Sequence, residues 1–239
     1  MRKAAKPVTL AVLFLLIPAA VFAGLFVFRE KSYTWISLCV AVLSLVPLLV
    51  RFERRESAAM ELTVIAVMAA LSAAGRFIFA WVPGFKPVTA IVMISGAYLT
   101  GEAGFVIGAL SAVVSKFYFG QGPWTPFQMF AWGLTGYLSG VLSKPLRQNR
   151  VLFAAAGALC GVFYSLVLDV FTSVWADGVL DLPRYISVAV SSLPTTLEYA
   201  VSNVVFILLL EKPIGKKLTR VRTKYGLFRD GEEAGEATA

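Results

Sequence analysis

The chain has 239 residues, of which 58% are apolar and only 15% are charged, so too few polar side chains remain to cover a water-soluble globule. A net charge of +8 does not indicate a nucleic-acid partner, because the basic residues are placed as membrane topology requires. With no histidine, and with Cys39 and Cys160 far apart in apolar runs, the sequence predicts no metal site, no cofactor and no enzymatic activity.

The N-terminal part, residues 1–52, is predicted to hold two transmembrane helices, near residues 8–28 and 34–50. Each run lacks charge and approaches the roughly 20 apolar residues that cross a bilayer. The first run is longer than the core of a signal peptide, which favours a retained anchor over the alternative of a signal cleaved after Ala23. A basic cytoplasmic linker, residues 53–59, follows.

Residues 60–211 are predicted to form six further spans, so the fold class is an all-α, polytopic helical membrane protein. Charge breaks and turn residues place these spans near residues 60–80, 87–100, 103–119, 126–143, 151–174 and 186–210. The tail, residues 212–239, is basic and then acidic, and we expect a cytoplasmic helix end that frays into disorder.

The basic residues predict the orientation in the membrane. Sixteen of the 22 Lys and Arg residues fall on one side of the predicted helices, which places both termini in the cytoplasm of a multi-pass plasma-membrane protein. Binding of anionic lipid by residues 216–224 is an alternative use of the tail, but we interpret its charge as a topology signal.

Polar residues within or near the spans are costly in lipid, so they indicate a binding site. We expect a cavity open to the outside, with the Gly- and Pro-rich turn 119–128 as its rim. Lys116 and Glu198 also lie within or near spans. An aromatic belt and snorkelling cations are the alternative for any single Trp or Lys. The candidate substrate-binding residues are Arg76, Trp81, Lys86, Gln121, Trp124, Gln128 and Asp169.

A stripe of small residues lies on the span that begins at residue 60. Ala66, Ala70 and Ala74 recur every fourth residue, so they share one helical face that another helix can approach closely. The partner helix can belong to this protein or to another one.

Residues 60–211 resemble the substrate-binding S component of energy-coupling factor (ECF-type) vitamin transporters. The resemblance rests on six spans with cytoplasmic ends and on residues 66–70, 85–90, 101–109 and 120–126. It implies a vitamin bound from outside and docking with a transmembrane coupling subunit and two ATPase subunits. It also implies that Ala66, Ala70 and Ala74 face the coupling subunit, and that the loop from Trp81 to Lys86 covers the site. The two extra helices depart from the family pattern.

The large, aromatic outer rim favours a bulky, ring-bearing vitamin. The loop resemblance favours cobalamin, with riboflavin or another heterocyclic vitamin as the alternative. A self-contained ion-coupled transporter using Asp169 or Glu198 is a rival function, although no internal repeat is evident. The chain lacks a nucleotide-binding loop, so another chain must hydrolyse any ATP.

Overall fold

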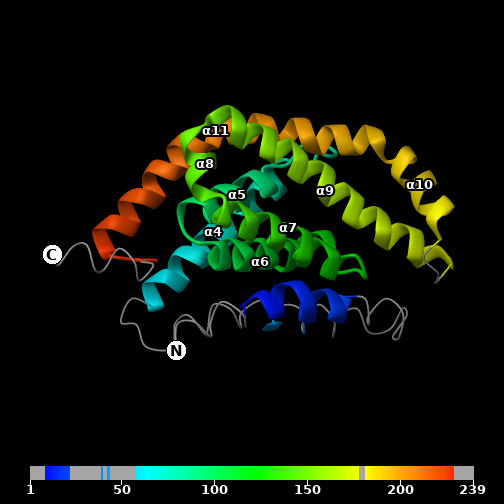
Figure 1. Cartoon of the computed structure of the whole chain (residues 1–239), viewed down its shortest axis with the longest axis horizontal. Helices are drawn as coiled ribbons and strands as arrows, with labels where there is room; N and C mark the ends of the chain where they lie inside the picture. The colour runs from blue at the N-terminus through cyan, green and yellow to red at the C-terminus, as the bar shows by residue number, and fades with distance from the viewer. Residues whose placement is uncertain (1–8, 22–38, 40–41, 44–57, 178–180, 229–239) are drawn as a thin grey trace.

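The computed structural model describes residues 9–21, 39, 42–43, 58–177 and 181–228, and these residues form helices and turns without strands. This confirms the all-α prediction (Figure 1). A short π-helix, η1 (Val12–Leu16), lies within the first helical segment. The other helices are α4 (Ala58–Ile78), α5 (Val88–Tyr98), α6 (Gly101–Phe119), α7 (Thr125–Val141), α8 (Ser143–Gln148), α9 (Arg150–Asp177), α10 (Leu182–Ser191) and α11 (Leu193–Tyr225).

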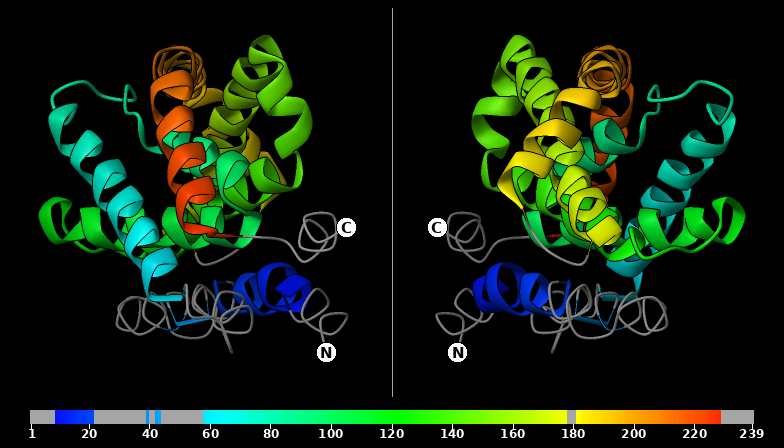
Figure 2. Two further views of the ribbon diagram at one scale, coloured as in Figure 1. Left: turned by 90° about the vertical axis from the view of Figure 1, so that its left-hand side faces the viewer. Right: turned by 90° about the vertical axis from the view of Figure 1, so that its right-hand side faces the viewer.

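Among the described residues, four helices, α4, α6, α9 and α11, are long and apolar enough to cross a membrane. The helix α5 has only 11 residues and is therefore about 16 Å long, which is too short to cross hydrocarbon alone. Its residues from Val88 to Ala97 are all buried, because α4, α6, α7, α9 and α11 surround it. The short helix is thus the centre of the protein. Figure 2 shows α4 and α9 on opposite sides of it.

The helices α9 and α11 pack along one another, and polar side chains join them. The Asn203 amide donates a hydrogen bond to the Gly157 carbonyl at 2.9 Å, and the Ser165 and Thr196 hydroxyls lie 2.7 Å apart. Such bonds give these polar groups hydrogen-bond partners, which the lipid hydrocarbon cannot provide.

Three helices meet at glycines. A Cβ atom on Gly136 of α7 would lie 2.3 Å from the carbonyl oxygen of Gly104 of α6, and one on Gly96 of α5 would lie 2.0 Å from the carbonyl oxygen of Gly136. One turn along, a Cβ on Gly140 would lie 2.3 Å from the amide nitrogen of Gly101. Only glycine allows the backbones to approach this closely, as in other membrane helix pairs that pack through small residues.

The predicted span 186–210 is two helices, which corrects the sequence interpretation. The helix α10 begins after Asp181, whose side chain accepts a hydrogen bond from the Arg184 amide at 3.3 Å. The chain then bends at Ser192, and α11 starts with Pro194 in its first turn, where a proline fits but cannot continue a preceding helix. An exposed apolar stripe, Leu182, Ile186 and Val190, makes α10 amphipathic.

The tail was expected to be a helix end that frays into disorder, and α11 continues through Pro213 to Tyr225. It ends at Gly226, whose φ of 61° is the left-handed conformation that commonly terminates helices. The Phe228 amide then donates a hydrogen bond to the buried carboxylate of Glu61 at 2.7 Å, which ties this end to the start of α4. The acidic residues 229–239 lie outside the described residues.

Of the two predicted N-terminal spans, only part is described. Residues 9–21 are helical, and Leu13 and Ile17 are fully buried. The Phe14 ring contacts the Tyr137 ring of α7 edge-on, with 6.1 Å between ring centres. The first helical segment, residues 9–21, therefore packs against α7. The span 34–50 lies almost wholly outside the described residues.

We predict that Gly136→Ala lowers the stability of the protein by about 1–3 kcal/mol, because its new methyl group would force α6 and α7 apart. Thermal melting of the purified protein in detergent would measure this loss. Gly157→Ala is the matched control, because its Cβ would meet the flexible end of Ile207, Cδ1, at 2.3 Å. That side chain can move, so we expect a smaller loss. Equal melting temperatures for wild type and Gly136→Ala would contradict the proposed close packing.

Candidate functional site

Arg76, in the last turn of α4, is buried against aromatic rings. Its Nη1 atom donates a hydrogen bond to the Ser115 hydroxyl of α6 at 2.6 Å. Its guanidinium carbon lies 4.7 Å from the ring centre of Phe119 and 5.2 Å from that of Trp132. Within the described part of the chain, its Nε atom has no hydrogen-bond partner. A buried donor without a partner costs roughly 1–3 kcal/mol, so a ligand that accepts from this atom would be stabilised.

A stacked aromatic pair lies next to Arg76. The rings of Trp132 of α7 and Tyr164 of α9 are 5.1 Å apart and nearly parallel, with an interplanar angle of 7°. Tyr199 of α11 meets Tyr164 edge-on at 5.2 Å. Gln128 of α7 donates from Nε2 to the Tyr164 hydroxyl at 2.8 Å, and its buried Oε1 has no partner among the described residues. Four helices thus build one group with an unused donor and an unused acceptor.

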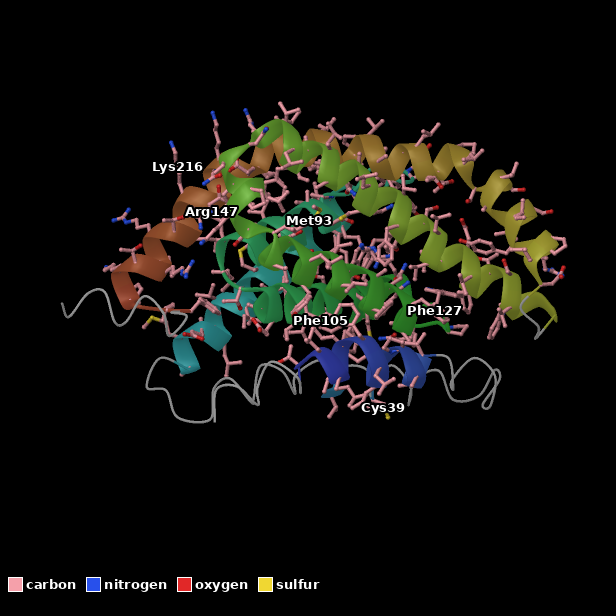
Figure 3. The ribbon with its side chains drawn as sticks, in the orientation of Figure 1. Cys39, Met93, Phe105, Phe127, Arg147 and Lys216 are labelled. Carbon is pink, nitrogen blue, oxygen red and sulfur yellow. The ribbon has the colours of Figure 1, made fainter. Side chains whose placement is uncertain are left out.

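A second aromatic group lies beside the start of α7. The ammonium group of Lys116 is 5.1 Å from the Trp124 ring centre, and Trp124 meets Phe171 of α9 edge-on at 6.3 Å. The Phe171 ring also contacts Phe127 at 5.4 Å and Trp175 at 5.5 Å. Figure 3 shows Phe127 at the end of the molecule opposite Arg147 and Lys216.

The site is positively charged. Arg76 and Lys116 are both buried, and in the described ranges no carboxylate lies within ion-pair distance of either. Buried cations without a counterion favour ligands with electron-rich or anionic acceptors. Among the described residues, no group of three or more His, Cys, Asp or Glu side chains is placed to hold a metal ion.

Asp169 lies at the edge of this region. Its Oδ2 atom accepts a hydrogen bond from the Ser192 hydroxyl at 2.7 Å, so this carboxylate links α9 to the bend between α10 and α11. No hydrogen bond within the described residues joins Asp169 to Gln128 or Trp124. Glu198, the other carboxylate of the rival ion-coupled mechanism, is exposed.

The loop between α4 and α5 is held against α11. The Lys86 amide donates to the Ser202 hydroxyl at 2.9 Å, and that hydroxyl donates to the Lys86 carbonyl at 3.1 Å. Partial burial and the nearby charge of Arg76 lower the pKa of Lys86, and Glu198 opposes this shift. The Trp81 side chain is 92% exposed and extends away from the protein. Gln121 is also exposed, on the turn before α7.

The structure therefore brings only some of the predicted residues together. Arg76 and Gln128 border the stacked pair, and Trp124 belongs to the second aromatic group. Among the described residues, no hydrogen bond or ring contact joins Trp81, Gln121 or Asp169 to the stacked pair. Four residues of these two groups were noted from the sequence as polar residues within or near spans but were not among the candidate substrate-binding residues: Lys116, Trp132, Tyr164 and Tyr199. Lys116 is a cation within a span and the three aromatic residues carry polar atoms, but snorkelling cations and an aromatic belt explain such residues equally well.

Comparisons with known proteins agree with this architecture. Residues 57–220 match the family model described as "ECF-type riboflavin transporter, S component". No curated protein and no solved structure matches significantly. The matched range contains residues 60–211, where the sequence resemblance was found. S components of ECF transporters bind a vitamin and work with membrane coupling and ATPase subunits, and they are not enzymes. This multi-pass membrane protein therefore belongs to the family of S components of ECF-type riboflavin transporters.

Proposed function

We propose that this protein captures a heterocyclic vitamin from outside the cell for ATP-driven uptake, and that the vitamin is riboflavin. The transported ligand would enter at the end of the molecule that carries the turn before α7. The opposite end carries α8 and the basic part of α11 (Figure 1). The excess of Lys and Arg at that end supports a cytoplasmic location for it.

The choice of riboflavin as the ligand rests on one observation. The unused Arg76 Nε donor and the unused Gln128 Oε1 acceptor border the same stacked pair, Trp132 and Tyr164. A flat ring that packs on such an aromatic surface, and that has carbonyl acceptors next to an imide N–H donor, would satisfy both atoms. The isoalloxazine ring of riboflavin has this edge.

The sequence favoured cobalamin over riboflavin, and two findings now support the reverse order. The matching family model is named for riboflavin. The rings of Trp132 and Tyr164 stack on one another, and a planar heterocycle could extend such a stack, whereas a corrin ring carries amide side chains on both faces. Cobalamin remains the alternative that a binding measurement must exclude.

We also propose that α4 docks on the coupling subunit. Ala66, Ala70 and Ala74 are exposed on the outer face of α4, whereas Ala69 and Ala73 of the same helix are buried. The exposed stripe would allow a partner helix to approach closely without any change inside this chain.

We predict that Gln128→Leu weakens riboflavin binding by about 1–3 kcal/mol, because it removes the acceptor and leaves the Tyr164 hydroxyl without its amide partner. Quenching of riboflavin fluorescence by the purified protein would measure the affinity. Gln148→Leu is the matched control, because Gln148 is exposed on α8 at the other end of the molecule.

Two outcomes would contradict the ligand assignment. Equal riboflavin affinity for Gln128→Leu and Gln148→Leu would remove Gln128 from the site. Binding of cobalamin without binding of riboflavin would replace the substrate but keep the role as an S component.

A second prediction separates docking from binding. Ala66→Leu and Ala70→Leu should reduce uptake by the assembled transporter, because bulk on this face blocks the coupling subunit, while riboflavin affinity of the isolated subunit stays unchanged. Uptake in whole cells and binding by the purified subunit would be measured in parallel.

Two control variants test whether a loss of uptake is specific to the exposed face of α4. Ala155→Leu adds the same bulk to an exposed position on α9 and should leave uptake intact. Ala69→Leu adds it to the interior, where Ala69 is 1% exposed, and should impair folding and binding together. Normal uptake by Ala66→Leu and Ala70→Leu would remove the docking assignment.

A further inference from the structure

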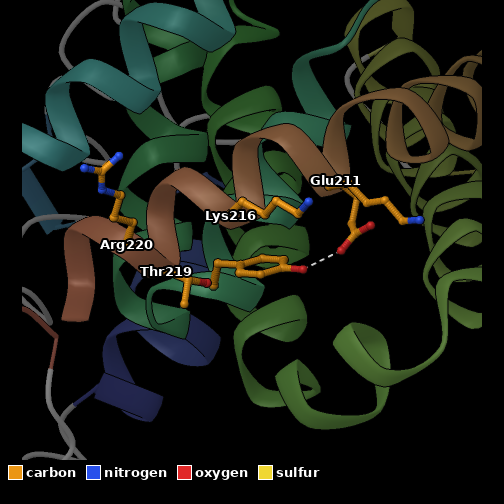
Figure 4. A pocket seen from close by; sticks show the side chains of 6 residues that line it. Glu211, Lys216, Thr219 and Arg220 are labelled. Atoms are coloured by element: carbon orange, nitrogen blue, oxygen red, sulfur yellow. Dashed lines mark hydrogen bonds between the residues drawn. The ribbon is translucent and has the colours of Figure 1, made fainter. Parts of the chain in front are cut away.

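A polar pocket lies at the end of the molecule opposite the aromatic site. Its volume is about 520 Å³, and it opens between the end of α5 and the C-terminal half of α11 (Figure 4). Neither the vitamin site nor the α4 stripe includes any of its residues. The lining residues are Tyr98, Glu211, Lys212, Lys216, Thr219 and Arg220.

The pocket has a net positive charge. Lys212, Lys216 and Arg220 contribute three cations, against the single carboxylate of Glu211. That carboxylate already accepts a hydrogen bond from the Tyr98 hydroxyl, as Figure 4 shows, and it lies 3.9 Å from the guanidinium of Arg150. The lining therefore holds three cations and one carboxylate, and that carboxylate is already hydrogen-bonded to Tyr98, so the pocket suits an anion.

Further positive charge surrounds the pocket. The guanidinium carbon of Arg147 lies 4.8 Å from the Tyr98 ring centre. The Thr219 side chain adds a hydroxyl that can donate a hydrogen bond to an anionic oxygen. A phosphate group, with several acceptor oxygens, matches cations and a hydroxyl donor in this arrangement.

The surface next to the pocket is apolar. Leu197, Val201 and Leu208 are exposed, and their spacing places them on the face of α11 that continues into Lys212 and Thr219. One face of the helix is thus apolar along the predicted membrane span and cationic just beyond it. This order matches an amphiphile, with acyl chains along the helix and an anionic headgroup at its end.

We propose that this pocket binds the phosphate of an anionic phospholipid in the leaflet at this end of the protein. The basic residues of the tail then have a role beyond orienting the chain. A soluble phosphate compound shares the same charge and acceptor oxygens, but it would make no use of the apolar face. The proposal does not depend on which vitamin the opposite site binds.

Native mass spectrometry of the full-length protein in detergent, titrated with dioleoylphosphatidylglycerol or dioleoylphosphatidylcholine, tests the proposal. We expect tighter binding of phosphatidylglycerol, because choline neutralises the phosphate of the other lipid. Each cation near an anionic headgroup contributes about fivefold in affinity, so Lys216→Gln with Arg220→Gln should weaken phosphatidylglycerol binding about 25-fold. Lys217→Gln is the matched control, because Lys217 is an exposed cation outside the pocket lining.

Four results would overturn the proposal. The first is equal affinity for the two lipids, and the second is equal loss in Lys217→Gln, which would indicate diffuse surface charge. The third is displacement of phosphatidylglycerol by millimolar inorganic phosphate, which would indicate a soluble ligand. The fourth is normal lipid binding by the double variant with loss of assembly with the coupling subunit, which would assign the pocket to protein docking. Unchanged thermal melting of the double variant would confirm that it folds.

Discussion

The close contact of α5, α6 and α7 at glycines is the constraint on which the rest of the structure depends. In lipid, apolar side chains gain little by leaving the solvent, so helices associate through close packing and through hydrogen bonds. Gly96, Gly104 and Gly136 bring three backbones together without side chains between them. The short α5 can then be enclosed completely, and the longer helices are arranged around it.

This packing also determines where the polar groups can lie. The middle of the bundle is filled by glycine contacts and by α5, and the buried cations of the described residues lie away from it. One end holds Arg76, Lys116 and Gln128 among aromatic rings, which lower the cost of burying the cations through cation–π contacts. The other end holds the basic part of α11 and its pocket.

Much of the fold could be predicted from the sequence, because apolar runs and charge breaks report directly on membrane helices. The spans predicted from residue 60 to 174 correspond in position to α4, α5, α6, α7 and α9, although α5 is too short to cross the hydrocarbon alone, which corrects the predicted span 87–100. The bend at Ser192 was missed, because hydropathy does not distinguish one long helix from two that are joined within an apolar run. The last predicted span stopped at residue 210 because the basic residues beyond it do not suit lipid, whereas α11 continues to Tyr225, since Lys and Arg are good helix formers.

The site was predicted less well than the fold, for a physical reason. Arg76, Gln128 and Trp124 could be named as candidates because polar or amphipathic residues in an apolar segment are costly and therefore informative. Trp132 and Tyr164 carry no such cost, and their nearly parallel rings come from two helices whose relative position no local pattern encodes. Asp169 was a candidate for the same reason, and in the structure its carboxylate accepts a hydrogen bond from Ser192.

The central claim is that this S component binds a planar heterocyclic vitamin, riboflavin, in the group formed by Arg76, Gln128 and the stacked pair. The most direct measurement is to purify the protein in detergent from cells, and then to identify any bound small molecule by absorbance and mass spectrometry. The account predicts a flavin spectrum and the mass of riboflavin, at up to one molecule per chain. A corrin spectrum with the mass of cobalamin would contradict it.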